Sequence, residues 1–323
     1  MVPGQPVTPT HRDAPAWVNA AAVLLPHLPF ARYRLLGRLR RLGTYPFLMR
    51  FPADLGGGVF HCDLRDATAA EVCFTGRYEP QETQLLRQLL GPGDVFADVG
   101  ANWGYYTLAA ASFVGETGRV VAFEPEPRLF SLLEANVAAN DRHQVSCQPT
   151  AVGSQRERVA FSGFSADGGN WGLSRVVDRE SAPPQYFESM SVPLDDALDA
   201  LSIGTVRLVK IDVEGSEVAV LAGMRRGLAS GRYRHIMLEC HPGLLAERGL
   251  HERASVQPLV DAGYRLWLID QSAAMHRRAA RGDVPRSELL RPYHVGAPMG
   301  GWPHIIATAP GVPDPSSELE ELT

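Results

Sequence analysis

The chain has 323 residues, of which 45% are hydrophobic and 21% charged, which is enough apolar sequence for a globular protein with a sizeable core. Its net charge of −5 gives no electrostatic case for a nucleic-acid partner. The four cysteines are scattered and form no C-x-x-C pair, which predicts reduced thiols rather than disulfides or a cysteine metal site.

The N-terminal part reads as a leader followed by a cap. Residues 1–15 are rich in Pro, Thr and His without periodicity, which predicts a disordered leader. From Ala31 to Leu42, leucines at helical spacing alternate with arginines and predict a basic amphipathic helix. We expect this helix to pack on the protein's own core; a membrane or an acidic partner surface is the alternative, and a homodimer contact is a further candidate role. With extended segments at Pro46–Phe51 and Gly58–Leu64, it makes residues 16–77 an N-terminal cap.

One apolar stretch, from Trp17 to Ala31, is interrupted by Pro26, His27 and Pro29. It is too broken for a membrane span, and it lacks the charged start and small-residue cleavage site of a secretion signal. We therefore expect a cytoplasmic protein without a membrane partner.

Strands and helices alternate after an expected helix over Pro80–Leu90. The expected strands are Val95–Val99, Arg119–Phe123, Val145–Val152, Val206–Ile211, His235–Leu238 and Tyr264–Ile269, and the clearest helices between them are Trp103–Phe113 and Arg128–Ala139. This alternation implies right-handed crossovers and a mostly parallel sheet, so the predicted fold class is α/β, doubly wound and Rossmann-like. If His304–Thr308 is the last strand, it follows the preceding strand without a helix and is expected to be antiparallel.

Two segments interrupt this alternation of strands and helices. Residues 153–192 are rich in Gly, Asn and Pro and too long for a simple connection, and residues 270–302 form a second excursion with many arginines and prolines. The polar, acidic residues 311–323 predict a flexible tail, which leaves residues 78–310 as the main domain.

The first strand ends in a glycine-containing turn, FADVGANWG. Gly100 lets the backbone pass close to a ligand, and Gly104 allows tight packing of the helix that follows. Glu124 ends the second strand about 20 residues later, the spacing at which a carboxylate accepts ribose hydroxyls. Turn and acid together suit NAD and S-adenosylmethionine equally.

Asp98 helps to distinguish between these two candidate cofactors. It lies in the last residues of the strand, on the face of Gly100. A dinucleotide places its pyrophosphate at such a turn, where a carboxylate is unfavourable, whereas S-adenosylmethionine presents a sulfonium and an ammonium, which carboxylates attract. The charge favours S-adenosylmethionine.

Four motifs resemble the FkbM family of S-adenosylmethionine-dependent methyltransferases: RYEPQETQLL (Arg77–Leu86), DVGANWGYYT (Asp98–Thr107), FEPEP (Phe123–Pro127) and above all LVKIDVEGSEVAVLAGM (Leu208–Met224). The resemblance is continuous over about residues 78–237 and extends loosely to residue 308. It implies a class I methyltransferase domain over residues 78–310, whose last strand is antiparallel.

The resemblance also implies site residues. Asp98, Gly100, Asn102 and Gly104 would line the methionine part of the cofactor, Glu124 the ribose, and Ala151 and Val152 the adenine, while Tyr78, Glu79 and Glu82 would close over it. Trp103 departs from the smaller residue common in the family, and we expect it to pack beneath the turn without contacting the cofactor.

Acidic residues end two further strands. Asp212 and Glu214 follow the fourth strand, and Glu239 and His241 follow the fifth, each pair two residues apart and so facing one side. His241 is the first candidate for a general base, Asp212 the next, and Glu239 completes the catalytic set; Asp212 is also expected to contact the cofactor. Alternatively, this group could hold Mg²⁺ and lower the pKa of the acceptor.

The predicted function is therefore S-adenosylmethionine-dependent O-methylation of a small acceptor, a sugar or natural-product hydroxyl, by base-assisted in-line transfer. An NAD-dependent oxidoreductase on the same turn, N-methylation, and a cofactor-binding protein without catalysis are the alternatives.

Overall fold

The structure is a computed structural model that describes residues 12–25, 37–39, 42, 45–163, 169–181, 186–294, 296, 297, 299 and 301–315. Most of the expected basic helix from Ala31 to Leu42 lies outside the described residues, as do residues 1–11 of the expected leader and residues 316–323 of the expected tail. No helix in the described part of the chain has the length and apolar composition that a membrane crossing requires.

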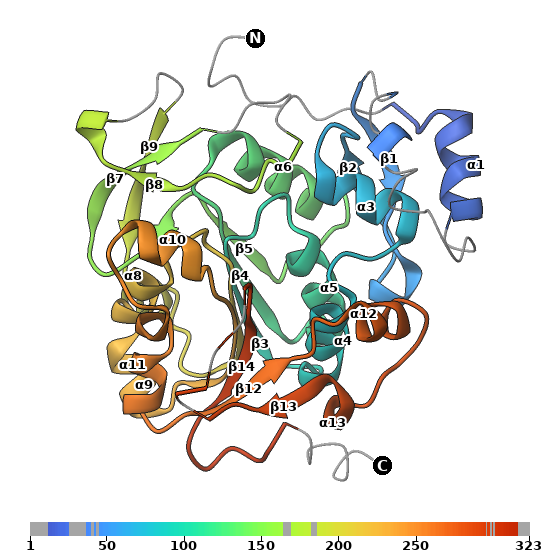
Figure 1. Ribbon diagram of the computed structural model, residues 1–323. Helices are drawn as coiled ribbons and strands as arrows, with labels where there is room; N and C mark the ends of the chain where they lie inside the picture. Colours follow the sequence, from blue (N-terminus) through green and yellow to red (C-terminus); the bar gives the residue numbers. More distant parts are fainter. Residues whose placement is uncertain are drawn as a thin grey trace.

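An eight-stranded sheet forms the centre of the molecule (Figure 1). In spatial order its strands are β13 (Leu290–Pro292), β12 (Arg265–Ile269), β14 (His304–Thr308), β11 (Tyr233–Glu239), β10 (Val206–Ile211), β3 (Val95–Val99), β4 (Arg119–Phe123) and β5 (Val145–Gln148). Neighbouring strands from β11 to β5 are parallel, whereas β14 is antiparallel to both β11 and β12. The predicted doubly wound, Rossmann-like α/β sheet with an antiparallel last strand is confirmed.

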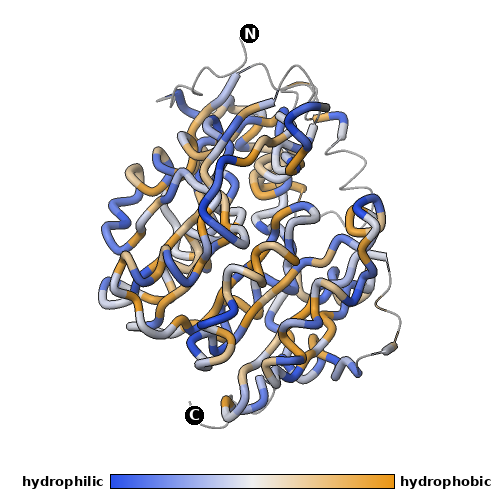
Figure 2. The backbone as a smooth tube through the Cα atoms, turned by 90° about the vertical axis from the view of Figure 1, so that its left-hand side faces the viewer, coloured by the Kyte–Doolittle hydropathy of each residue, from blue (hydrophilic) through white to orange (hydrophobic). Residues whose placement is uncertain are grey.

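Helices cover both faces because successive residues of each buried strand point to opposite sides. Phe96 and Leu208 face one core, which includes residues of α4 (Pro80–Leu89), α5 (Tyr105–Val114) and α6 (Pro127–Ala138). Ala97 and Val209 face the other, which includes residues of α7 (Leu194–Ala200), α8 (Glu217–Ala222), α9 (Arg225–Ser230) and α11 (Gln257–Asp261). Figure 2 shows the resulting apolar segments running through the middle of the molecule.

Two expectations about the strands need correction. The expected third strand, Val145–Val152, is divided into β5 and the short β6 (Ala151–Val152), which pairs in a different sheet. Pro149 lies at the division, and a proline has no N–H to donate to a sheet. The last two long strands are also not joined without a helix: α12 (Ala273–Ala279), α13 (Arg286–Leu289) and the edge strand β13 lie between them.

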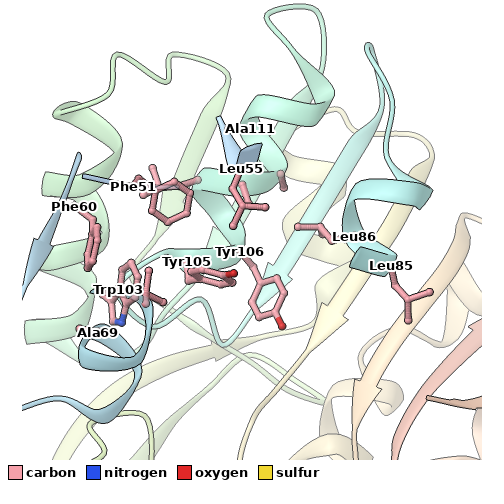
Figure 3. Packing of buried hydrophobic residues seen from close by; sticks show 14 of the residues in the cluster. Phe51, Leu55, Phe60, Ala69, Leu85, Leu86, Trp103, Tyr105, Tyr106 and Ala111 are labelled. Carbon is pink, nitrogen blue, oxygen red and sulfur yellow. The ribbon is translucent and has the colours of Figure 1, made fainter. Parts of the chain in front are cut away.

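The N-terminal segment packs on the main sheet's helices. It contains α1 (Ala16–Leu24), β1 (Phe47–Arg50), β2 (Val59–Cys62) and α3 (Ala67–Thr75), with a 3-10 turn at Ala53–Leu55. Strands β1 and β2 form an antiparallel hairpin. The ring of Trp103 is buried and stacks on Phe60 of this hairpin with ring centroids 5.0 Å apart. Figure 3 shows the two side chains next to each other. Trp103 thus packs away from the cavity described below.

The turn-rich segment after β6 builds a second, smaller sheet. Its order is β6, β9 (Tyr186–Val192), β7 (Glu157–Ser162) and β8 (Val176–Val177). In Figure 1 its strands β7, β8 and β9 lie beside α10 (Pro242–Glu247), the helix that follows β11. Short 3-10 turns at Arg179–Ser181 and Glu252–Ser255 complete the described elements.

A buried asparagine links the hairpin to the glycine-containing turn that follows β3. Oδ1 of Asn136 accepts the backbone N–H of His61 at 2.7 Å, and its Nδ2 donates to the carbonyl of Trp103 at 2.7 Å. Asn136→Ala leaves both buried groups unpaired, so we expect the free energy of unfolding to fall by about 2–4 kcal/mol in urea titrations. Asn19→Ala, which removes an exposed hydrogen bond, is the control and should cost under about 0.5 kcal/mol. Equal losses in the two variants would contradict the assigned role of Asn136.

Candidate functional site

A cavity of about 480 Å³ opens where the parallel strands end. Residues at the carboxyl ends of β3, β4, β10 and β11 line it, and β7 and the loop before β8 cover another side. The strand order reverses here, since β4 and β5 lie on one side of β3 and β10 and β11 on the other. Ligands of doubly wound sheets bind at such a switch point, and the volume is in the range of cofactor pockets.

The cavity brings most of the predicted residues together. Among the expected cofactor residues, its lining includes Tyr78, Gly100, Asn102, Glu124, Ala151, Val152 and Asp212. The expected catalytic residues Glu239 and His241 line it as well. Glu79, Glu82, Asp98 and Gly104 are not among the residues that line the cavity, and of these four Glu82 pairs with a lining residue, His304.

Gly100 permits a very close passage of two backbone segments. Its φ is +88°, and a Cβ added there would lie 1.9 Å from the carbonyl oxygen of Asp212. Gly104 has a φ of +99°, and its Cβ would lie 2.7 Å from a methyl group of Leu133 on α6. The first glycine therefore joins the ends of β3 and β10, and the second allows α5 to approach α6.

Glu124 organises the turn. Its Oε2 accepts the backbone N–H of Asn102 at 2.8 Å, and its Oε1 accepts that of Glu126 at 2.9 Å. Burial raises the pKa of Glu124 to about 8, although both backbone donors act in the opposite direction. Oδ1 of Asn102 accepts the N–H of Trp103 at 2.8 Å, so the side chain of Asn102 also stabilises the turn.

Asp98 is buried beneath the turn. Its Oδ2 accepts the hydroxyl of Thr107 at 2.6 Å, while its Oδ1 is buried and has no hydrogen-bond partner among the described residues. Burial raises its pKa, and the nearby charge of Lys210 lowers it. Asp98 therefore lies behind the cavity wall, bonded to Thr107, and does not line the cavity.

The segment before α4 reaches the cavity only through Tyr78. Oε2 of Glu79 accepts the hydroxyl of Tyr106 at 2.7 Å, and Oε1 of Glu82 lies 2.9 Å from Nδ1 of His304. Burial opposes protonation of His304, but the charge and hydrogen bond of Glu82 raise its pKa to about 10. These two glutamates thus position side chains around the cavity.

At the end of β10, Asp212 is paired with Lys210. Lys210 Nζ lies 2.9 Å from Asp212 Oδ2 and 4.5 Å from the centre of the Tyr106 ring. Burial opposes ionisation of Asp212, but Lys210 lowers its pKa below the usual value. Asp212 is therefore an ionised carboxylate at the wall of the cavity.

At the end of β11, His241 lies among carboxylates. Nδ1 of His241 lies 2.5 Å from Oε1 of the fully buried Glu217, and its Nε2 lies 3.5 Å from both Glu214 Oε2 and Glu239 Oε1. Glu239 Oε1 is also 3.7 Å from Nε2 of His304. Two imidazoles, each held at Nδ1 by a buried glutamate, therefore point toward the same carboxylate oxygen.

These contacts shift several pKa values. Burial works against protonation of His241, but Glu217, Glu214 and Asp212 raise its pKa above the usual value. Burial, reinforced by Asp212, raises the pKa of Glu239 to about 9, and burial raises that of Glu214 to about 7. The result is a group of carboxyls whose ionisation depends on which cations lie beside them.

Three side chains at this site were not expected from the sequence. Glu217 follows the EGS turn of the fourth strand, His304 opens the last strand, and Trp302, 65% exposed, packs edge-on against His241 with ring centroids 6.1 Å apart. Glu217, three residues after Glu214, could have been suspected from the acidic run in VEGSE. No local signal marks His304 or Trp302, because strand β14 reaches the site only by pairing between β11 and β12.

Comparisons with known proteins give one family. The family model described as the methyltransferase FkbM domain matches residues 98–266. The curated 31-O-demethyl-FK506 methyltransferase FkbM of Streptomyces tacrolimicus is 35% identical over 180 residues, which cover 47% of this chain and 67% of that protein. The hexuronic acid methyltransferase AglP of Haloferax volcanii is 28% identical over 172 residues, covering 52% of this chain and 64% of that protein.

The chain thus spans about two thirds of the length of these two relatives. Among solved structures, a SAM-dependent O-methyltransferase from Thermotoga maritima aligns with a TM-score of 0.39 and 15% identity over 78% of this chain and 73% of that one.

Proposed function

The chain belongs to the FkbM family of S-adenosylmethionine-dependent methyltransferases, and we propose that it methylates a hydroxyl oxygen of a sugar or natural-product acceptor. One observation carries the proposal. A single cavity has the ribose-type carboxylate Glu124 at one strand end and the group of Asp212, Glu239 and His241 at two others. A cofactor bound along the switch point would therefore extend toward a cluster suited to proton removal.

The residues present fit S-adenosylmethionine. The ionised Asp212 favours a cationic ligand beside the turn, and Glu124 offers a carboxylate for ribose hydroxyls. S-adenosylmethionine supplies a methyl group on a positively charged sulfur, which leaves as a neutral sulfide when an acceptor oxygen takes the methyl. Ala151 and Val152 are the proposed apolar contacts of the adenine, and Gly100 and Asn102 those of the methionine part.

Loss of the hydroxyl proton is assigned to the carboxylate cluster. We place Glu239 first as proton acceptor because its Oε1 lies at the centre of the cluster, facing both imidazoles. Only the ionised carboxyl can take the proton, and its pKa of about 9 means that this form becomes more populated as the pH rises. His241, the first candidate for general base in the sequence analysis, is assigned a supporting role instead. Its Nδ1 is held by Glu217, and its carboxylate neighbours favour a protonated ring. Asp212 pairs with Lys210, which keeps the ammonium group of Lys210 away from the acceptor.

The names of the two relatives, which specify an oxygen of FK506 and a hexuronic acid, support this acceptor class. The proposed test incubates the protein with S-adenosylmethionine radiolabelled in its methyl group and a panel of sugars and hydroxylated natural products, and locates the label by NMR. Label on oxygen supports the proposal. Label on nitrogen, or calorimetric binding of NAD but not of S-adenosylhomocysteine, would overturn it.

Cofactor binding should depend on pH through Glu124. Its raised pKa of about 8 means that the carboxylate is protonated below this value, and only the ionised form accepts two ribose hydroxyls. We expect the affinity for S-adenosylhomocysteine to rise from pH 6 to pH 9, by up to about tenfold per unit below pH 8. In Glu124→Gln, calorimetry should show weaker binding and a smaller pH dependence. An unchanged pH profile in this variant would exclude Glu124 as the titrating group.

A further inference from the structure

One nitrogen of His241 has no assigned partner. The side chain is 2% exposed, and Nε2 forms no hydrogen bond with any residue of the described chain. Its neighbours Glu214 Oε2 and Glu239 Oε1, both at 3.5 Å, are farther away than the 2.7–2.9 Å typical of a charge-assisted hydrogen bond. Nε2 therefore faces two carboxylates in the cavity without a hydrogen bond to either, a position that a ligand in the cavity would complete.

The spacing of the surrounding atoms fits a metal ion. One ligand atom each from Asp212, Glu214 and His241 lies within 4.8 Å of the others. Ligands at about 2.0–2.2 Å from a common ion lie roughly 3–4.4 Å from one another, so only small adjustments would be needed. All three residues line the cavity, so an ion among them would be open to the acceptor.

The residue behind His241 supports the same reading. Glu217 is fully buried and holds Nδ1 of the ring, which leaves Nε2 directed into the group. Metal-binding histidines commonly have their second nitrogen held by a carboxylate in this way.

The charges of the surrounding carboxyls are a second, independent reason to expect a cation here. Asp212, Glu214 and Glu217 bring three carboxyls to a partly buried region in which Lys210 is paired with one of them. Carboxylates removed from water need a compensating cation or a proton. A divalent ion would supply two positive charges at the point where Nε2 and the carboxylates meet.

We propose that Asp212, Glu214 and His241 bind a divalent cation such as Mg²⁺ or Mn²⁺ at the acceptor end of the cavity. This inference rests on the proposed function, because the ion is assigned the task of binding the acceptor oxygen and easing loss of its proton, which Glu239 takes. Carboxylates and one imidazole suit such hard ions, and Glu217 acts as a positioning residue. His241 would bind through Nε2 of its neutral ring, so the ion takes the place of the proton that the surrounding carboxylates favour when no ion is bound.

A second group, Glu79, Glu239 and His304, has similar spacing. Glu79 does not line the cavity, and one of its oxygens already accepts the hydroxyl of Tyr106. An ion there would be less accessible to an acceptor, so we assign the site to His241 rather than to His304.

Manganese provides the test. The purified full chain, stripped with EDTA and dialysed, is titrated with Mn²⁺ while electron paramagnetic resonance follows the free ion, and pulsed measurements detect coupling to a histidine nitrogen. We expect one site per chain with nitrogen coupling. His241→Gln should lose the coupling, and both His241→Gln and Glu214→Gln should bind Mn²⁺ at least about tenfold more weakly. Glu217→Gln should weaken binding by about 10- to 100-fold although it contacts no ion.

Controls separate this proposal from the proposed function. Glu157→Gln changes another carboxylate that lines the cavity, on β7, and should leave Mn²⁺ affinity unchanged. Binding of S-adenosylhomocysteine, measured by calorimetry on each metal-free variant, reports the cofactor site and the fold. Retained cofactor binding without Mn²⁺ binding, no nitrogen coupling, or loss of Mn²⁺ only in His304→Gln would each overturn the ion site while leaving methyl transfer standing.

Discussion

Gly100→Ala is expected to abolish measurable binding of S-adenosylhomocysteine and to lower the free energy of unfolding by about 2–5 kcal/mol. The new Cβ would lie 1.9 Å from the carbonyl oxygen of Asp212, a backbone atom that cannot move without separating β3 from β10. The φ of +88° adds the strain of a left-handed residue with a side chain. Urea unfolding followed by circular dichroism gives the stability, and calorimetry gives the affinity.

Gly76→Ala is the matched control for this change. Gly76 has a φ of +72° at the end of α3, but nothing lies within 4 Å of its added Cβ. It should therefore show only the conformational cost, about 1–2 kcal/mol, and keep full cofactor affinity. If Gly100→Ala is no worse than Gly76→Ala, the close passage between the two strand ends does not limit the site.

Glu239→Gln should reduce kcat for methyl transfer by about 100- to 10,000-fold, with the acceptor found in the radiolabelling experiment. The amide has nearly the same shape as the carboxyl but cannot take the hydroxyl proton. Glu239 lies outside the proposed cofactor contacts, so the affinity for S-adenosylhomocysteine should change by no more than about threefold. Single-turnover kinetics separate the chemical step from product release.

Glu116→Gln makes the same chemical change at an exposed position just before β4 and should leave kcat unaltered. A second comparison is His241→Gln, which should lower kcat through loss of positioning. If Glu239→Gln retains kcat and His241→Gln loses it, then His241 is the proton acceptor, as the sequence analysis expected.

Much of the central sheet could be predicted from local patterns. Strands β3, β4 and β10 have the bounds expected from the sequence, because a parallel strand covered on both faces is rich in apolar residues. The family is also readable, since DVGANWG and KIDVEGSE are continuous motifs whose match to the FkbM model is confirmed. The residue assignments within the site stay predictions.

Other features had no local signal. The division of β5 from β6 at Pro149 depends on which sheet each half joins, and the placement of β14 brings His304 to Glu239 across a separation of 65 residues. Both result from strand pairing between distant segments, which the pattern of single residues does not encode.

The sequence by itself determined the class of protein: alternating apolar strands and helices require a doubly wound sheet, and two motifs at strand ends carry the chemistry of a methyltransferase. Only the tertiary structure decided which of those residues meet. Four expected site residues lie outside the cavity lining: Glu79, Glu82, Asp98 and Gly104. Glu217 contacts His241 and Glu82 contacts His304, and both imidazole rings face Glu239. The physical reason is that spacing along the chain defines the face of one strand, whereas contacts between side chains depend on how separate strands and helices pack.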